Sequence, residues 1–425
     1  MRTAMWLEQP RPAALVVDAA PASAGSRNGG PASSVSRSRG SASAQTADGD
    51  PRADVTVVAC SMREAREWLG SGPAKDADAV PAMARALRDR FVKPVCVVGV
   101  ADTGGRTLDW LDTEHARGWL APAGETIGDG EHFAVHLATA IGKGFVAADA
   151  AILARMATTR RAASAVEFVN DPAVLPLLSW NERPRFSETR SASEATSRRL
   201  DLYAIVDGAD RVLRVVAAGF RTVQLRIKAP PAPDAEWHTM LRREVQQSIA
   251  ACAAAGAELF VNDHWQLAGE LGAHGVHLGQ EDLVALDDAD RSALQATRLA
   301  LGVSSHSLWE LCRARSLAPR YIACGPVWPT LTKAMPWVPQ GLDNLAWWCR
   351  MAQAPVVAIG GVLGAGQVYD AARCGADGVC IVRGLGEFPE RVLPALREAL
   401  EAGRREHANQ RSEPLWPHPS LRPLP

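Results

Sequence analysis

The chain has 425 residues, of which 47% are hydrophobic and 22% charged, and its formal net charge is −1. This length is enough for two or three domains, each with its own core. The near-zero charge gives no reason to expect electrostatic capture of nucleic acid or of an anionic membrane surface, and no apolar run approaches the roughly 20 residues that span a bilayer. The eight cysteines form no C-x-x-C pair. Reduced core cysteines of a cytoplasmic protein are therefore favoured over disulfides or a zinc site.

Residues 1–50 are rich in Ala, Ser, Gly, Arg and Pro and have almost no periodic apolar pattern, which predicts disorder. They contain no continuous apolar h-region, which argues against a secretory signal. Their Arg and Ser bias also fits an organellar transit peptide, but a low-complexity extension is the simpler interpretation.

Residues 51–160 have a globular pattern. Short apolar runs predict strands and helical periodicity predicts helices: strands at 55–59 and 95–100, helices at 63–69, 79–90 and 131–142. The last helix follows Gly128-Asp129-Gly130, and a Gly-x-Gly turn before a helix can present backbone amides to phosphate.

This segment resembles the C-terminal end of hydroxymethylpyrimidine-phosphate kinases, which have the ribokinase-like fold. In those kinases a Gly-Thr-Gly-Cys turn forms the anion hole. Here Asp129 replaces the threonine and Glu131 the cysteine, and two carboxylates would repel a nucleotide phosphate. The resemblance spans less than half of such a domain. It therefore implies a degenerate, inactive kinase segment. The alternative is a working kinase in which Glu131 acts as a base.

Residues 161–198 read as a linker, although 174–180 are apolar enough to dock on a neighbouring element. From 199 to 403, short strands and helices alternate. The eight predicted strands are 202–206, 222–227, 258–261, 275–278, 299–303, 321–325, 356–359 and 378–382. Eight such units in about 200 residues predict an α/β fold with a (β/α)8 TIM barrel. A doubly wound sheet is the alternative, but 206–208 makes a poor Gly-rich turn. The Pro-rich tail, 404–425, is predicted to be disordered.

The strand at 222–227 has an unusual inner face. Alternation places Gln224, Arg226 and Lys228 on one side and Leu225 and Ile227 on the other. Two cations are costly to bury unless an anion meets them. The alternative is an edge strand with a charged, solvated face.

Polar residues or glycines follow nearly every later strand, at the end where TIM barrels place their chemistry. They are Asn262, Asp263, Asp282, Ser304, Ser305, Thr330, Thr332, Lys333, Gly360, Gly361, Val382 and Arg383. Taken singly, some could be helix caps or turn residues. The histidines His264, His274, His277 and His306 lack metal-ligand spacing and are interpreted as structural or solvent-facing.

Together these residues suggest two anion sites. Asp263 and Asp282 are suited to Mg²⁺, which binds through one or two carboxylates plus substrate phosphates. Arg226, Lys228 and Lys333 could surround a diphosphate, while amides after the last two strands could hold a singly phosphorylated molecule. No nucleophile stands out, so the set predicts a departing diphosphate.

The same residues lie in motifs that resemble the thiamine-phosphate synthase family. The motifs are QLRIK, VND, GVHLGQEDL, LGVSSHS, GPVWPTLTK, VVAIGG and GADGV, in the family's order across residues 200–400. The resemblance implies that hydroxymethylpyrimidine diphosphate loses diphosphate through a carbocation and is joined to a thiazole phosphate, or its carboxylated form, to give thiamine phosphate.

By position, the resemblance assigns the pyrimidine diphosphate to Gln224, Arg226, Lys228, Asn262, Ser304 and Lys333, and Mg²⁺ to Asp263 and Asp282. It assigns the thiazole phosphate to Thr330, Thr332 and the amides of Gly361, Val382 and Arg383. Of these, Arg226, Lys228, Ser304 and Lys333 would be catalytic. The family usually has serine in place of Arg383, whose guanidinium could add a phosphate contact or crowd the pocket.

Two alternatives belong to other classes. One is a barrel that binds thiamine-pathway phosphates as a regulator or tautomerase, and the other is a bifunctional kinase and synthase. The retained aspartates and cations argue against the first. A homo-oligomer is also possible.

Overall fold

The computed structural model describes residues 15–18, 55–70, 77–126, 130–159, 168–186, 199–330, 336–409 and 415–421. The chain forms two compact units, the first made chiefly of residues up to Phe186 and the second a barrel. Within the described ranges, no helix is both long and apolar enough to cross a membrane.

The first unit is built on a six-stranded sheet with the strands in sequence order. They are β1 (Leu15–Asp18), β2 (Val55–Ser61), β3 (Val95–Ala101), β4 (Thr107–Asp112), β5 (Arg117–Ala121) and β6 (Leu177–Leu178). Only β2 and β3 are parallel. The helices are α1 (Met62–Leu69), α2 (Val80–Phe91), α3 (Gly130–Gly142) and α4 (Ala147–Ala157), with 3-10 turns η1 (Ala77–Ala79), η2 (Phe168–Asn170) and η3 (Pro172–Val174).

Packing and one buried ion pair hold this unit together. Trp110 and Trp119 lie edge to face in the core, with ring centroids 5.2 Å apart. Arg155 of α4 donates from Nε and Nη2 to the two carboxylate oxygens of Asp109 on β4, both at 2.6 Å. Because both side chains are buried, removing either would leave the other charge unpaired.

The first unit differs from the sequence-based expectations in three places. Leu15–Asp18 pairs with β2 inside the segment predicted to be disordered. Strands β4 and β5 were not predicted. Leu177–Leu178 extends the sheet by pairing with β5, inside the predicted linker. Residues 128 and 129 and the side chain of Glu131 lie outside the described part, so the kinase-like assignment stays a prediction.

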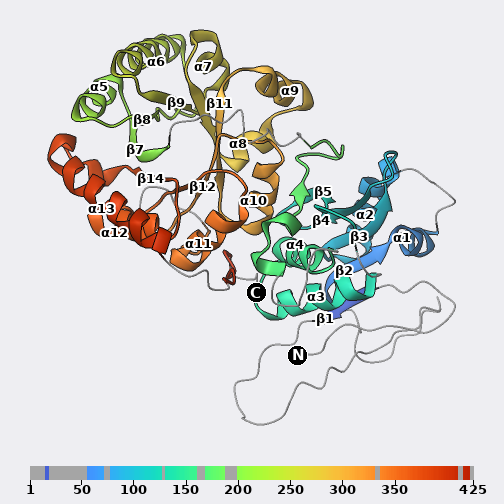
Figure 1. Cartoon of the computed structure of the whole chain (residues 1–425). Coiled ribbons are helices and arrows are strands. Elements are labelled where there is room, and N and C mark those ends of the chain that lie inside the picture. The colour runs from blue at the N-terminus through green and yellow to red at the C-terminus, as the bar shows by residue number, and fades with distance from the viewer. Residues whose placement is uncertain are drawn as a thin grey trace. The chain divides into compact units, whose positions relative to one another are not determined.

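The second unit is a closed barrel of eight parallel strands, as predicted (Figure 1). The strands are β7 (Asp201–Val206), β8 (Thr222–Leu225), β9 (Glu258–Asn262), β10 (Gly275–Leu278), β11 (Ala300–Ser305), β12 (Tyr321–Cys324), β13 (Val356–Ala358) and β14 (Gly378–Ile381). Each predicted strand matches one of these within two residues at either end. Strands β14 and β7 close the ring.

Helices follow the strands and lie around the ring. They are α5 (Ala209–Ala218), α6 (Ala235–Ala255), α7 (Trp265–Leu271), α8 (Gln280–Ala285), α9 (Asp288–Ala296), α10 (Leu308–Arg315), α11 (Gly341–Met351), α12 (Ala365–Arg373), η4 (Arg383–Leu385) and α13 (Pro389–Asn409). Helix α13 continues past Gly403, where the tail was predicted to begin. Residues 415–420 belong to the barrel unit and are held to it, since Asn344 Oδ1 accepts from the His418 amide at 2.8 Å.

The interior of the barrel is filled by side chains. Tyr203, Phe260 and Tyr321 are fully buried there, and the two tyrosine hydroxyls are 2.8 Å apart. All eight cysteines are described, all are thiols, and six are buried, as the composition predicted.

Candidate active site

A cavity opens at the carboxyl ends of the barrel strands, enclosing about 180 Å³. It brings together most of the residues singled out from the sequence: Gln224, Arg226, Lys228, Asn262, Asp263, Asp282, Ser304, Thr330, Gly360, Gly361, Val382 and Arg383. Thr332 and Lys333 lie outside the described residues. Ser305 is buried and accepts from the indole N–H of Trp348, so it supports the core rather than the cavity.

The end of β8 supplies an amide and two cations. The Gln224 side chain is buried and its Nε2 donates to the Tyr203 hydroxyl at 3.3 Å. Arg226 is anchored through its backbone, since its amide donates to Val206 O at 2.7 Å. The ammonium of Lys228 forms an ion pair with the carboxylate of Asp263, at the end of the neighbouring strand. Gln224, Arg226 and Lys228 all line the cavity and Leu225 and Ile227 do not, as predicted, although the strand ends at Leu225 rather than at Ile227.

The ends of β9 and β10 supply an amide and two carboxylates. Asn262 is 4% exposed, and within the described residues its Nδ2 has no hydrogen-bond partner. Asp263 has a left-handed backbone, with φ of 66°. Asp282 accepts from the Gly279 amide at 2.8 Å. Burial raises the pKa of the Asp282 carboxyl, and the negative charge of Asp263 raises it further.

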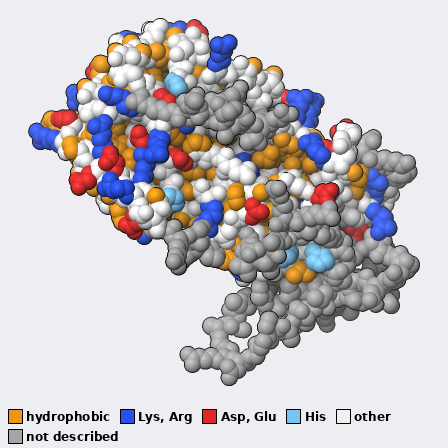
Figure 2. Space-filling view, viewed as in Figure 1, with side chains coloured by type: hydrophobic (Ala, Val, Ile, Leu, Met, Phe, Trp, Pro, Cys, Tyr) orange, Lys and Arg blue, Asp and Glu red, His pale blue; other side chains and the backbone are white. Residues whose placement is uncertain are grey.

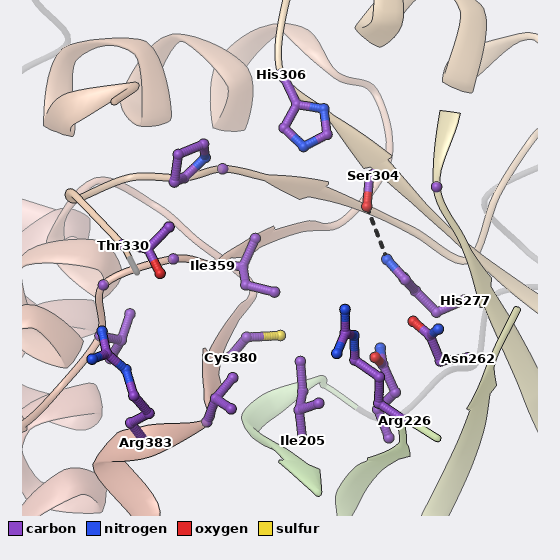
Figure 3. A pocket seen from close by; sticks show the side chains of 18 of the residues that line it. Ile205, Arg226, Asn262, His277, Ser304, His306, Thr330, Ile359, Cys380 and Arg383 are labelled. Carbon is purple, nitrogen blue, oxygen red and sulfur yellow. Dashed lines mark hydrogen bonds between the residues drawn. The ribbon is translucent and has the colours of Figure 1, made fainter. Parts of the chain in front are cut away.

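His277 holds Ser304 in place. Its Nε2 lies 3.0 Å from Ser304 Oγ, the contact drawn in Figure 3, and its Nδ1 lies 2.9 Å from the Tyr321 hydroxyl. Burial lowers the pKa of His277 to about 4, so the ring is neutral near pH 7. Gln280 Nε2 donates to the Ser304 carbonyl at 2.8 Å and fixes the same residue from the backbone side.

The loops after β13 and β14 form the other side of the cavity. Gly360 and Gly361 have φ of 93° and 76°. A Cβ on Gly361 would lie 2.5 Å from Trp328 Cβ, so glycine is required by both backbone conformation and space. Val382 precedes the 3-10 turn that begins at Arg383. In Figure 3, Arg383 and Thr330 lie on the side of the cavity away from Arg226 and Asn262, with Ile359 and Cys380 between them.

The cavity therefore has two polar sides separated by an apolar strip. Strands β8–β11 adjoin one another in the ring and carry the cations, carboxylates and Ser304, while β13 and β14 carry the glycine amides and Arg383. Such an arrangement can hold two different anionic molecules with their reactive parts near the middle.

The two carboxylates fit a magnesium ion. Among the described residues, no group of three or more His, Cys, Asp or Glu is arranged to bind a metal. Mg²⁺ does not need such a cage, because it is often held by one or two carboxylates with substrate phosphates and water. Burial is the main cause that raises the pKa of Asp282, and the negative charge of Asp263 adds to it; a divalent cation beside these carboxylates would offset both effects.

Comparison with known proteins matches residues 202–385 to the family model described as thiamine monophosphate synthase. The thiamine-phosphate synthase of Rhizobium etli is 45% identical over 194 residues, which are 45% of this chain and 90% of that protein. The chain belongs to the thiamine monophosphate synthase family. The enzyme of Neisseria meningitidis serogroup B is 45% identical over 218 residues, covering 51% of this chain and 95% of that protein. A thiamine phosphate pyrophosphorylase of Pyrococcus furiosus is 25% identical, covers 48% of this chain and 97% of its own, and has a TM-score of 0.41.

The members of this synthase family are transferases, as the resemblance implied. Several residues that line this cavity were not assigned to the site from the sequence. His277 and His306 line it, although they were interpreted as structural or solvent-facing, and so do Ile205, Glu281 and Cys380. The alternation of residues 275–278 would have placed His277 inward, but its hydrogen bond to Ser304 depends on the register of β10 against β11.

Proposed function

We propose that the chain joins 4-amino-2-methyl-5-hydroxymethylpyrimidine diphosphate to 4-methyl-5-(2-phosphoethyl)thiazole, or its carboxylated form, giving thiamine phosphate and diphosphate. The observation that carries this proposal is the convergence of Arg226, Lys228, Asp263 and Asp282 on one side of a cavity whose other side consists of glycine amides and Arg383. That distribution suits a diphosphate on one side and a monophosphate on the other.

The reaction exchanges one bond for another. The bond between the pyrimidinylmethyl carbon and the diphosphate oxygen breaks, and its electron pair leaves with diphosphate. The thiazole nitrogen then gives its lone pair to the resulting cation, so the product is a thiazolium. No side chain has to act as a nucleophile, and stabilising the departing charge is the main task.

The first side of the cavity would bind the diphosphate substrate. Gln224 and Asn262 offer buried amides to the pyrimidine, and the Asn262 Nδ2 that has no partner among the described residues would gain one. Arg226 and Lys228 would bind the phosphoryl oxygens, together with Lys333. Asp263 and Asp282 would hold Mg²⁺, which when bound neutralises charge on the leaving diphosphate.

Ser304 and the second side of the cavity would orient the partners. The neutral His277 ring fixes the hydroxyl of Ser304 toward the diphosphate side. The thiazole phosphate would bind to Thr330, Thr332 and the amides of Gly361, Val382 and Arg383. Gly361, which is favoured by its positive φ, has no side chain that would block the phosphate from its amide.

The test is direct. The full chain with both substrates and Mg²⁺ should release diphosphate and form thiamine phosphate in equal amounts, whereas either substrate alone should release almost none. Arg226→Gln should lower the rate by about a hundredfold, equivalent to about 2.7 kcal/mol of lost transition-state stabilisation. Arg243→Gln is a matched control, because Arg243 is exposed on α6 and, among the described residues, forms an ion pair only with Glu244, at 3.7 Å. Absence of thiamine phosphate with the unmodified chain would contradict the proposal.

A further inference from the structure

A second cavity lies at the opposite end of the barrel, where strands β7 and β8 begin. It encloses about 520 Å³ and is formed by the start of β7, the turn between α5 and β8, and one face of α13. Its floor is apolar, with Leu202, Phe220 and Leu393. The synthase reaction proposed above uses none of these residues.

Arginine dominates the lining of this second cavity. Five arginines face two carboxylates, and the five are Arg199, Arg221, Arg397, Arg404 and Arg405. On the face that Figure 2 shows, basic and acidic side chains are mixed over the barrel surface.

The two carboxylates are already occupied. Asp201 accepts from Arg404 Nη1 at 2.6 Å, in a half-buried ion pair. Glu401 lies 3.9 Å from Arg405, and both side chains are largely exposed, so this pair is weak. Neither acid is left to neutralise the other arginines.

Within the residues that the structure describes, three of the arginines form no ion pair. Arg221 Nη1 donates to the carbonyls of Val216 and Phe220, at 3.0 and 2.9 Å, and Arg397 Nη2 donates to Gly219 O at 2.7 Å. Carbonyls orient a guanidinium but carry no formal charge. Arg199 has no ion-pair partner in the part of the chain that the structure describes.

The backbone is shaped to admit Arg397. Gly219 has φ of 117°, and a Cβ at this position would lie 2.9 Å from Arg397 Nη2 and 3.2 Å from Leu393 Cδ2. The glycine therefore lets the guanidinium rest against the turn. A held guanidinium loses little further freedom when its remaining N–H groups meet an anion.

We propose that this second cavity binds a small molecule with a diphosphate group, at a site separate from the first cavity. Planar guanidinium groups match phosphoryl oxygens in bidentate geometry, and three uncompensated charges exceed what a single phosphate needs. The apolar floor offers a surface for an organic group on an ester. The proposal does not depend on the reaction at the other end of the barrel.

The experiment is calorimetric titration of the full chain with inorganic diphosphate, with ADP and with orthophosphate. We expect two diphosphate sites per chain, of which Arg226→Gln removes one. Arg199→Gln and Arg397→Gln should each weaken diphosphate binding at the second cavity by about tenfold, the effect of losing one charge-assisted contact. Arg199 is exposed and its substitution removes no described contact, so a loss of fold cannot account for its effect.

Each outcome decides the proposal. ADP binding more tightly than diphosphate identifies an ester as the ligand, and equal binding identifies the diphosphate group alone; both support the site. A single diphosphate site that Arg226→Gln abolishes and Arg199→Gln leaves unchanged would overturn it, as would orthophosphate binding as tightly as diphosphate. Equal weakening by the control Arg243→Gln and by Arg199→Gln would show general charge attraction, and would also overturn it.

Discussion

Lys228 and Asp263, at the ends of adjacent strands, form an ion pair across the mouth of the first cavity. The proposed reaction assigns the lysine to the diphosphate and the aspartate to Mg²⁺, so substrate and metal together would replace each partner of this pair. In the absence of ligand, the two side chains neutralise each other, so neither charge is left unpaired. When substrate and Mg²⁺ bind, each side chain would exchange its partner for a ligand of opposite charge.

Asp263→Asn tests the aspartate with little disturbance of the backbone. Asp263 has φ of 66°, and asparagine tolerates this left-handed conformation better than most residues. We expect at least about a hundredfold loss in the rate of diphosphate release, with little change in melting temperature. Asp207→Asn is the control, because Asp207 is exposed and, in the part of the chain that the structure describes, forms an ion pair only with exposed Arg211. Full activity of Asp263→Asn would remove this residue from the metal site.

Gly361→Ala and Gly272→Ala form a matched pair. Both glycines have positive φ, 76° and 74°, but a Cβ on Gly361 would meet Trp328 Cβ at 2.5 Å, whereas a Cβ on Gly272 would have nothing within 4 Å. Both variants should lose about 1 kcal/mol of unfolding free energy from backbone strain. Only Gly361→Ala should lose more than that, and only it should raise the KM for the thiazole phosphate. The measurements are chemical denaturation and initial rates. Equal losses of unfolding free energy and equal KM values in the two variants would show that the contact with Trp328 has no effect.

Arg383→Ser tests the residue that departs from the family. If the guanidinium contacts the phosphate, its removal should raise the KM for the thiazole phosphate by about tenfold while kcat changes little. A lower KM in the serine variant would show instead that Arg383 crowds the cavity. Initial rates over a range of thiazole phosphate concentrations, at saturating pyrimidine diphosphate, measure the difference.

Local alternation predicted the cation side of this cavity, because the inward positions of residues 222–227 follow from a period of two. Contacts set by register between strands were not predictable in this way. His277 pairs with Gly302 in the β10–β11 ladder, which brings Ser304 within reach, and no local pattern reports that pairing.

Strand β4, which was not predicted, carries two buried acids, Asp109 and Asp112. Asp109 is neutralised by Arg155, and Asp112 Oδ1 lies 2.7 Å from Arg88 Nη1. These partners are remote in sequence, so no local pattern shows that the two acids can be buried.

His277 should make stability depend on pH in a defined window. Its pKa falls from 6.5 when unfolded to about 4 when folded, so between these values the unfolded chain binds the additional proton. The histidine's contribution to stability is thus complete above pH 6.5 and is lost as the pH falls toward 4, by at most about 3 kcal/mol. His277→Gln, which can still hydrogen-bond Ser304 and Tyr321, should show a flatter pH dependence. Urea denaturation of both proteins at several pH values gives the difference, and parallel curves would contradict the assignment.

Removal of residues 1–198 tests what the first unit contributes. The barrel closes on itself through β14 and β7, and about half of this chain spans 90% or more of two related synthases. We therefore expect the shortened chain to fold and to retain most of its rate of thiamine phosphate formation. Circular dichroism and the coupled assay for diphosphate measure the two properties. A folded but inactive barrel would mean that the first unit takes part in the reaction or in assembly.

ATP consumption by the first unit with the pyrimidine monophosphate would restore the bifunctional alternative. We expect no such consumption, because the two carboxylates at positions 129 and 131 would repel a nucleotide phosphate.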